Sequence, residues 1–347
     1  MDWNGITGRF GDAWPQMAKF AKIYGILMVG YYIVFYLSGI TSETTLYYGY
    51  ADRMFHGEMP YSDFDAEYPP LSLLLILIPR LLSFNELSYQ IVFGIMAYLS
   101  LIAATYFIYR IAERYTNRPS RYTDVFLILC VIFVDFILDR YDVFPMVLTV
   151  AAVYFFISGR RNAAWVAVAA GTMIKLYPAL LAPVFLIHLI SRKEYSEAVK
   201  GVGICVAIGI VCMLPFVIAD PETALMFITY HADRGMQVES IVSSFIMFLS
   251  LFGLTEITYY FGSGSDNIAG ALPDACADIM LPLMAVAMIA AYAAYAYTLK
   301  KYREQGRTDV MPPLMMTCFM VIFIFMTVNK VTGAAQYLGS LLFLLYP

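Results

Sequence analysis

Runs of apolar residues alternate with short polar segments along almost the whole chain. Many of them approach the length of about 20 residues with which a helix crosses a bilayer. The pattern predicts an all-α fold, a polytopic transmembrane helical bundle of about 10 spans. The clear runs are 23–40, 88–109, 123–138, 143–158, 162–174, 178–190, 201–217, 279–298 and 311–328.

The last apolar run begins near 337 and stops at Pro347, which makes it too short to span a membrane. We expect either that the natural chain continues or that this segment is only a half-helix. Two other stretches, 71–83 and 241–254, are also short. We treat residues 1–347 as a single integral membrane domain.

Positive charge predicts the topology, because cytoplasmic loops of membrane proteins are enriched in Lys and Arg. Sixteen of the 22 basic residues fall in five places, which we assign to the cytoplasm. The N-terminus is then cytoplasmic, and 71–83 and 241–254 must lie along the outer face instead of crossing. The first outer loop is 41–87 and the late outer loop is 218–278. The basic places are the N-terminus, 110–121, 160–161, 192–200 and 300–307.

Composition supports a membrane protein and excludes other classes. Of the 347 residues, 61% are hydrophobic and 14% are charged, whereas soluble domains carry about 25% charge. A soluble enzyme, a disordered chain and a nucleic-acid binder are therefore excluded, and the net charge of -4 adds to the case against nucleic acid. The five cysteines show no CxxC spacing and no nearby His pair, so neither a disulfide framework nor a zinc site is indicated.

Six basic residues fall outside the five cytoplasmic places, on the outer side or near its membrane edge. Charges at such positions are costly unless they pair with acids or face a cavity. Each one alone is explained equally well by an ion pair that holds helices together. The presence of all six on one side of the membrane favours a shared anionic ligand. These residues are Arg53, Arg80, Arg140, Lys175, Arg234 and Lys330.

The first outer loop combines acids, tyrosines, glycine and prolines. A solvated acidic loop with an interfacial aromatic belt would explain the tyrosines. The prolines and Gly57 instead indicate a loop of defined shape. We expect a short helix over 47–56 with Gly57 near its end, and an extended entry at Tyr68-Pro69-Pro70 into the helix 71–83.

Several dispersed motifs resemble glycosyltransferases of the GT-C type. The most similar group is glycosyltransferase family 87, whose members include polyprenol-phosphate-mannose-dependent mannosyltransferases. The resemblance implies a helical membrane bundle with short interfacial helices in the first outer loop, and transfer of a sugar on the outer face from a lipid-phosphate donor. The motifs are residues 43–47, 57–64, 67–71, 139–145, 172–178, 230–240, 329–330 and 336–337.

The resemblance also implies an inverting reaction, which requires a base for the acceptor hydroxyl. Family members carry an acid early in the first outer loop, often Asp, and Glu43 matches that position. We expect Glu43 to be the base and Asp63 to be the second candidate. The alternative for Glu43 is an acid favoured by the helix dipole near an N-cap, since Thr41, Ser42 and Thr44 surround it.

Cations near the membrane surface are needed to hold the departing lipid phosphate. Our candidates are Lys175, Arg140, His231 and Arg234. An ion pair of Lys175 with Asp139 or Asp142 is the alternative, and His231 is equally well explained as a solvated loop residue. Candidates for sugar or acceptor binding are Tyr47, Glu67, Tyr68, Asp142, Tyr177, Gln237 and Glu239.

We expect no cofactor and no metal ligand set, with a divalent cation as the alternative because carboxylates suit Mg²⁺ or Mn²⁺. The expected partners are a polyprenyl- or dolichyl-phosphate sugar, the bilayer, and a glycolipid or glycan acceptor. A multi-span transporter or lipid flippase is a competing interpretation, although we find no internal repeat of the kind transporters show. A GT-C polymerase or ligase, transfer of another sugar, and a noncatalytic scaffold are further alternatives.

Overall fold

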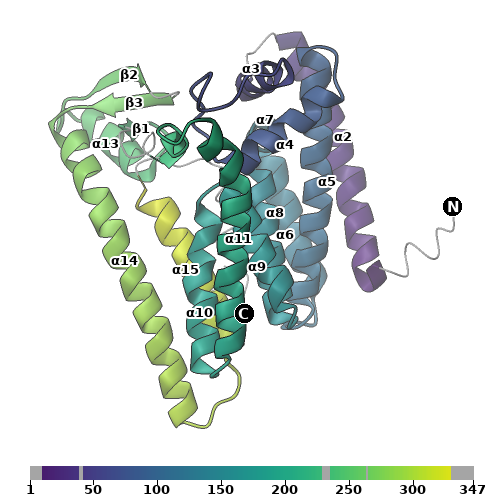
Figure 1. The fold of residues 1–347 in the computed structure, drawn as a ribbon, viewed down its shortest axis with the longest axis vertical. Coiled ribbons are helices and arrows are strands. Elements are labelled where there is room, and N and C mark those ends of the chain that lie inside the picture. Colours follow the sequence, from purple (N-terminus) through teal and green to yellow (C-terminus); the bar gives the residue numbers. More distant parts are fainter. Residues whose placement is uncertain (1–9, 39–41, 229–234, 263–264, 330–347) are drawn as a thin grey trace.

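Helices dominate the fold in a computed structural model that describes residues 10–38, 42–228, 235–262 and 265–329 (Figure 1). Within the described residues, four helical segments are long and apolar enough to cross a membrane. The predicted helical class is confirmed, while the count of about 10 spans stays a prediction. The four are α2 (Trp14–Ser38) with the 3-10 turn η1 (Gly11–Ala13) before it, α5 (Glu86–Ala112), α11 (Tyr195–Ala219) and α14 (Ala271–Glu304).

Shorter apolar helices complete the bundle. The predicted run 123–138 is divided at Phe133 into α6 and α7. The predicted run 178–190 begins within a 3-10 turn, η2, and continues as α10. These elements are α6 (Pro119–Ile132), α7 (Val134–Asp139), α8 (Val143–Ile157), α9 (Arg161–Ile174), η2 (Tyr177–Leu180), α10 (Leu181–Ser191) and α15 (Met311–Thr327).

Glycine allows two pairs of helices to approach closely. A Cβ at Gly94 of α5 would lie 2.0 Å from the Tyr32 hydroxyl oxygen of α2, and that hydroxyl donates to the Gln90 carbonyl at 3.0 Å. A Cβ at Gly201 of α11 would lie 2.0 Å from Trp165 of α9. The absence of a side chain at both positions therefore permits the packing of α2 on α5 and of α11 on α9.

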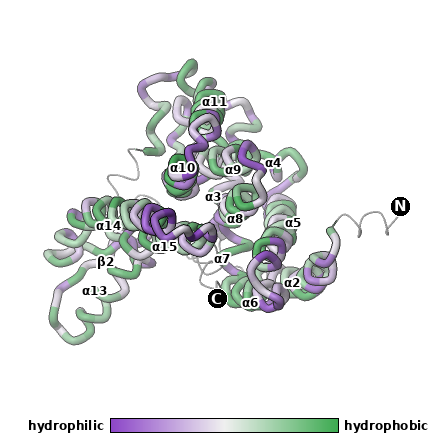
Figure 2. The backbone as a smooth tube through the Cα atoms, turned by 90° about the horizontal axis from the view of Figure 1, so that it is seen from below, coloured by the Kyte–Doolittle hydropathy of each residue, from purple (hydrophilic) through white to green (hydrophobic). Residues whose placement is uncertain are grey.

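The two ends of the bundle differ in character. The elements of the two predicted outer loops gather at one end, the upper end in Figure 1. Figure 2 views the opposite end, where hydrophilic positions mark the connection between α14 and α15. The helix order places the connections with the predicted cytoplasmic charges at this opposite end. The side of the membrane that each end faces stays a prediction.

Two short helices shape the first outer loop. α3 (Glu43–Phe55) begins four residues before the predicted start at 47, because Ser42 caps it by accepting a hydrogen bond from the Thr44 N–H. It ends before Gly57, whose φ of 94° suits glycine. α4 (Pro70–Leu81) is 12 residues long, about 18 Å at 1.5 Å per residue, which is too short to cross a hydrocarbon core of about 30 Å.

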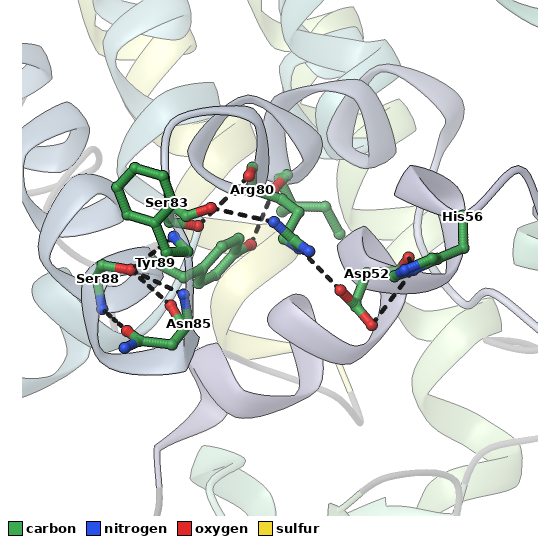
Figure 3. Close-up of polar contacts among 9 residues, drawn as sticks. Asp52, His56, Arg80, Ser83, Asn85, Ser88 and Tyr89 are labelled. Atoms are coloured by element: carbon green, nitrogen blue, oxygen red, sulfur yellow. Dashed lines mark hydrogen bonds and ion pairs between the residues drawn. The ribbon is translucent and has the colours of Figure 1, made fainter.

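The corner between α3, α4 and α5 is fixed by polar contacts (Figure 3). The Arg80 guanidinium donates to Asp52 at 2.8 Å and to the Ser83 carbonyl at 3.1 Å. Asn85 and Ser88 form a capping box that starts α5. The Tyr89 hydroxyl donates to the Ile76 carbonyl at 2.9 Å, which ties α5 to α4. These contacts give the first outer loop a defined position on the bundle.

The late outer loop contains a three-stranded antiparallel sheet that the apolar pattern did not predict. Its strands are β1 (Met236–Gln237), β2 (Thr258–Gly262) and β3 (Ser265–Ala269), in the order β1-β3-β2. Helix α13 (Ile241–Leu251) lies between β1 and β2 in sequence. Met236, Ile246, Ile268 and Met280 form a small core that attaches the sheet and α13 to α14.

Candidate active site

Arg140 joins three segments that are distant in sequence. Its guanidinium donates two hydrogen bonds to the Glu239 carboxylate, at 3.0 and 2.9 Å, and contacts the Glu43 carboxylate at 3.5 Å. Arg140 directly follows α7, Glu43 opens α3, and Glu239 lies between β1 and α13. A guanidinium engaged by two parallel hydrogen bonds is held in a fixed orientation. Arg140 therefore links the end of α7 to both outer loops.

Glu43 occupies the first position of α3, as the N-cap alternative anticipated. The Asp139 carboxylate accepts hydrogen bonds from the Ser42 hydroxyl and from the Glu43 N–H, the latter at 3.1 Å. Burial raises the pKa of the Glu43 carboxyl above its ordinary value, and Arg140 partly opposes this increase. A carboxylate with a raised pKa and a fixed backbone is suited to accept a proton.

Two buried polar oxygens next to this cluster lack a hydrogen-bond partner among the described residues. One is Oε2 of Glu67 and the other is Oε1 of Gln237, and both side chains are only 8% exposed. Gln237 also donates from Nε2 to Glu239 at 3.1 Å. Unpartnered buried oxygens are unusual in folded proteins. Both of these oxygens have the chemistry of hydrogen-bond acceptors and are free to accept a bond from a ligand. They are suited to bind the hydroxyl groups of a sugar.

Three tyrosines form an aromatic wall behind the cluster. Tyr47, Tyr68 and Tyr141 pack edge to face, with ring centroids 5.8, 5.7 and 5.0 Å apart. Burial raises the pKa of the phenols of Tyr47 and Tyr68 well above the ordinary value. The wall is therefore neutral at physiological pH, and it holds α3 and the residue before Pro69 in place.

Lys175 pairs with Asp142, one of its two predicted alternatives. Asp142 is buried and Lys175 lies 5.2 Å from the centre of the Tyr141 ring. Tyr177 is buried two residues further along. The other described outer cations are paired as well: Arg53 with Glu58, Arg80 with Asp52, and Arg140 with Glu239. Each described member of the six therefore forms an ion pair, and a shared anionic ligand stays a prediction.

Asp63, the second predicted base, makes its described contacts within its own loop. Its carboxylate accepts from the Met59 N–H at 2.7 Å, and its carbonyl accepts from Arg53 at 3.0 Å. These contacts shape the loop. Asp63 is exposed, whereas the carboxylates beside Arg140 are those of Glu43 and Glu239. His231 and Arg234, with Lys330, lie outside the described residues.

The arrangement also contains a residue that was not among the predicted site residues. Asp139 was predicted as the first residue of the motif 139–145 and as an alternative partner of Lys175, and in the structure it binds Ser42 and Glu43 instead. The feature of the sequence that could have identified Asp139 as a site residue is its position directly before Arg140. Within the described ranges, no group of three or more His, Cys, Asp or Glu side chains is placed to hold a metal ion. Independence from metal stays a prediction.

At one end of the helical bundle, two carboxylates surround one arginine in a partly exposed cluster made of Glu43, Arg140 and Glu239. A comparison with known families matches residues 67–328 to glycosyltransferase family 87. The chain belongs to this family and is a membrane glycosyltransferase, which confirms the resemblance. The match includes Glu67, Arg140 and Glu239 and begins after Glu43. A search of curated proteins finds no match.

Proposed function

We propose that the protein transfers a hexose, mannose, from a polyprenyl or dolichyl monophosphate to a glycolipid or glycan acceptor. The observation that carries the proposal is the contact of Glu43, a carboxylate with a raised pKa, with Arg140. The enzyme is a multi-pass protein of the cell membrane with a cytoplasmic N-terminus. The reaction takes place at the end that carries the two outer loops, on the extracytoplasmic face.

The chemistry is a single displacement with inversion. Glu43 accepts the proton of the acceptor hydroxyl while that oxygen forms a bond to C1 of the sugar. The bond between C1 and the phosphate oxygen breaks, and the electron pair leaves with the lipid monophosphate. Arg140 and Lys175 stabilise the negative charge that develops on the phosphate.

Both cations are engaged with carboxylates in the described structure. The donor phosphate therefore competes with Glu239 for Arg140 and with Asp142 for Lys175. The unpartnered oxygens of Glu67 and Gln237 accept hydrogen bonds from sugar hydroxyls. Tyr47 and Tyr68 supply the wall of this subsite, and Tyr177 is buried two residues after Lys175.

The test is a transfer assay with purified protein in liposomes. Radiolabelled polyprenyl-phosphate mannose is offered with a lipid extract from the source cell. We expect transfer by the wild type and a loss of about 10²-fold or more in Glu43→Gln, since removing a general base has effects of that order. The matched control is Asp63→Asn, which should retain transfer because Asp63 shapes a loop.

Loss of transfer in Asp63→Asn with retention in Glu43→Gln would move the base to Asp63. Absence of transfer with mannose, glucose and galactose lipid donors, from protein that is demonstrably folded, would reject the lipid-donor mechanism. Transfer with glucose or galactose but not mannose would change the sugar and keep the mechanism.

A further inference from the structure

Large apolar side chains are exposed on α13 and on β2. Leu251 is 81% exposed, Phe261 is 76% exposed and Phe245 is 61% exposed, and Phe248 and Tyr259 are also exposed. We call these five residues the apolar flap. Exposed apolar surface of this kind marks contact with a protein, a ligand or a membrane.

The segment that carries the apolar flap is almost free of charge. Between Ile241 and Gly262, Glu256 is the only residue that is charged at neutral pH. A protein interface normally surrounds its apolar core with a polar and charged rim. The combination of Phe, Leu and Tyr with one charge in the segment is instead typical of the boundary between lipid headgroups and acyl chains.

The elements that carry the apolar flap adjoin a long helix with an exposed apolar surface. α13 and β3 both contact α14, a helix long and apolar enough to cross the membrane. α14 exposes Ile279, Leu283 and Val286. Figure 1 shows the sheet and α13 at the upper end of α14, and Figure 2 shows α13 and β2 beside α14 at the margin of the bundle. The flap therefore lies at the margin of the bundle, beside the upper end of an apolar helix long enough to cross a membrane.

We propose that α13 and β2 lie in the outer leaflet at the headgroup–acyl boundary, with the apolar flap immersed in lipid. The depth follows from the backbone of β2, which is an edge strand of the described sheet. Unpaired N–H and C=O groups at a sheet edge are not tolerated in the hydrocarbon core. The flap is therefore shallow, at the level of an interfacial aromatic belt.

This position connects the membrane surface to the candidate active site. β1 carries Gln237 at one edge of the sheet, and β2 carries Phe261 at the other, with β3 between them. Neighbouring strands are about 4.8 Å apart, so the two edges are separated by about 10 Å. The sheet therefore links the strand that carries Phe261 to Gln237, which donates to Glu239 of the candidate active site.

The test measures lipid contact without any substrate. Phe261→Trp and Phe248→Trp are reconstituted separately in phosphatidylcholine liposomes that contain nitroxide lipids, labelled either near the headgroup or deep in the chain. The emission of the parent, with its three native tryptophans, is subtracted. The control is Gln305→Trp, an exposed site at the other end of α14.

We expect the shallow label to quench the added emission at least about twofold more than the deep label, as for an interfacial segment. Aqueous iodide should quench the Gln305→Trp emission and spare both flap positions. Iodide quenching equal to the control would overturn the proposal, because the flap would then face water. Protection from both iodide and nitroxide would assign the face to a second copy of the chain, and stronger quenching by the deep label would contradict the interfacial depth.

Discussion

The protonation of Glu43 sets the pH dependence expected of the reaction. Burial raises the pKa of this carboxyl above its ordinary value of 4.5, while Arg140 lowers it. A general base must be deprotonated, so kcat/KM should fall as the pH decreases through the pKa of Glu43. Because this pKa is raised, the fall should begin at a higher pH than it would for a Glu with an ordinary pKa. A pH profile of kcat/KM in the transfer assay measures this limb.

Two substitutions should move the acid limb, the part of the profile where kcat/KM falls at low pH, in opposite directions. Glu239 contributes a negative charge that raises the pKa of Glu43, so Glu239→Gln should shift the limb to lower pH. Arg140→Gln removes the opposing positive charge and should shift it to higher pH, in the activity that remains. Limbs that stay fixed in both variants would show that Glu43 is not the titrating base.

Glu67 provides a second residue-scale prediction, because its buried Oε2 has no described partner. Glu67→Gln keeps the size of the side chain and one of its two oxygens. It replaces the other oxygen, an acceptor, with an NH₂ group that can only donate. We expect transfer to fall by about 10-fold or more, since a lost hydrogen bond to a charged group is worth about 1.5–3 kcal/mol. The thermal midpoint should not decrease.

A decrease of the midpoint together with normal transfer would assign Glu67 a structural role. Glu58→Gln is the matched control, because Glu58 is an exposed carboxylate that pairs with Arg53 away from the cluster. It should leave transfer unchanged.

Some partners could be predicted from the sequence and others could not. The pair of Lys175 with Asp142 was one of two predicted alternatives. Glu43 was predicted as the base from the family resemblance, because it matches the acid early in the first outer loop. Its contact with Arg140 joins residues 97 positions apart, and the pair of Arg140 with Glu239 spans 99. Such contacts depend on how the helices pack, which local pattern does not determine.

At the scale of the element, the start of α3 determines where Glu43 lies. Asp139 accepts two hydrogen bonds there, one at each carboxylate oxygen, from Ser42 and from the Glu43 N–H. Asp139→Asn has only one acceptor oxygen on its side chain, so one of these bonds is lost. We expect kcat to fall by about 10-fold with an unchanged KM for the donor, because the base is displaced.

The control for this element is Ser42→Ala, which removes the N-cap and one partner of Asp139. N-cap removal costs about 1 kcal/mol, so the thermal midpoint should decrease, while Asp139 still accepts from Glu43. Equal losses of kcat and of stability in Asp139→Asn would indicate general unfolding instead of a displaced base.

The elements themselves were predicted with uneven success, for physical reasons. The helix expected over 47–56 exists but begins at Glu43, because the N-cap side chain of Ser42 outweighs the aromatic pattern. The sheet was missed because β2, Thr-Tyr-Tyr-Phe-Gly, is a short apolar run that a membrane protein offers in many places. Its aromatic residues before a glycine-rich turn are a hairpin signal that the long apolar runs obscured.

At the scale of the whole molecule, the pair of Lys175 with Asp142 connects the end of α9 to the start of α8. Breaking a buried pair by removing one partner costs about 3–5 kcal/mol, whereas removing both costs much less. Lys175→Met and Asp142→Asn should each lower the thermal midpoint in detergent, and the double variant should recover part of the loss. Additive losses would show that the two groups do not interact.

The contact of Arg140 with Glu239 has a consequence for biosynthesis. A nascent chain that has inserted its helices through α8 already carries Glu43, Asp139 and Arg140, while Glu239 has not been translated. Until that residue crosses the membrane, the guanidinium lacks the partner that fixes its orientation. The candidate site is therefore completed late in synthesis, and a ribosome-bound intermediate that ends after α11 still lacks the carboxylate that holds Arg140 in place.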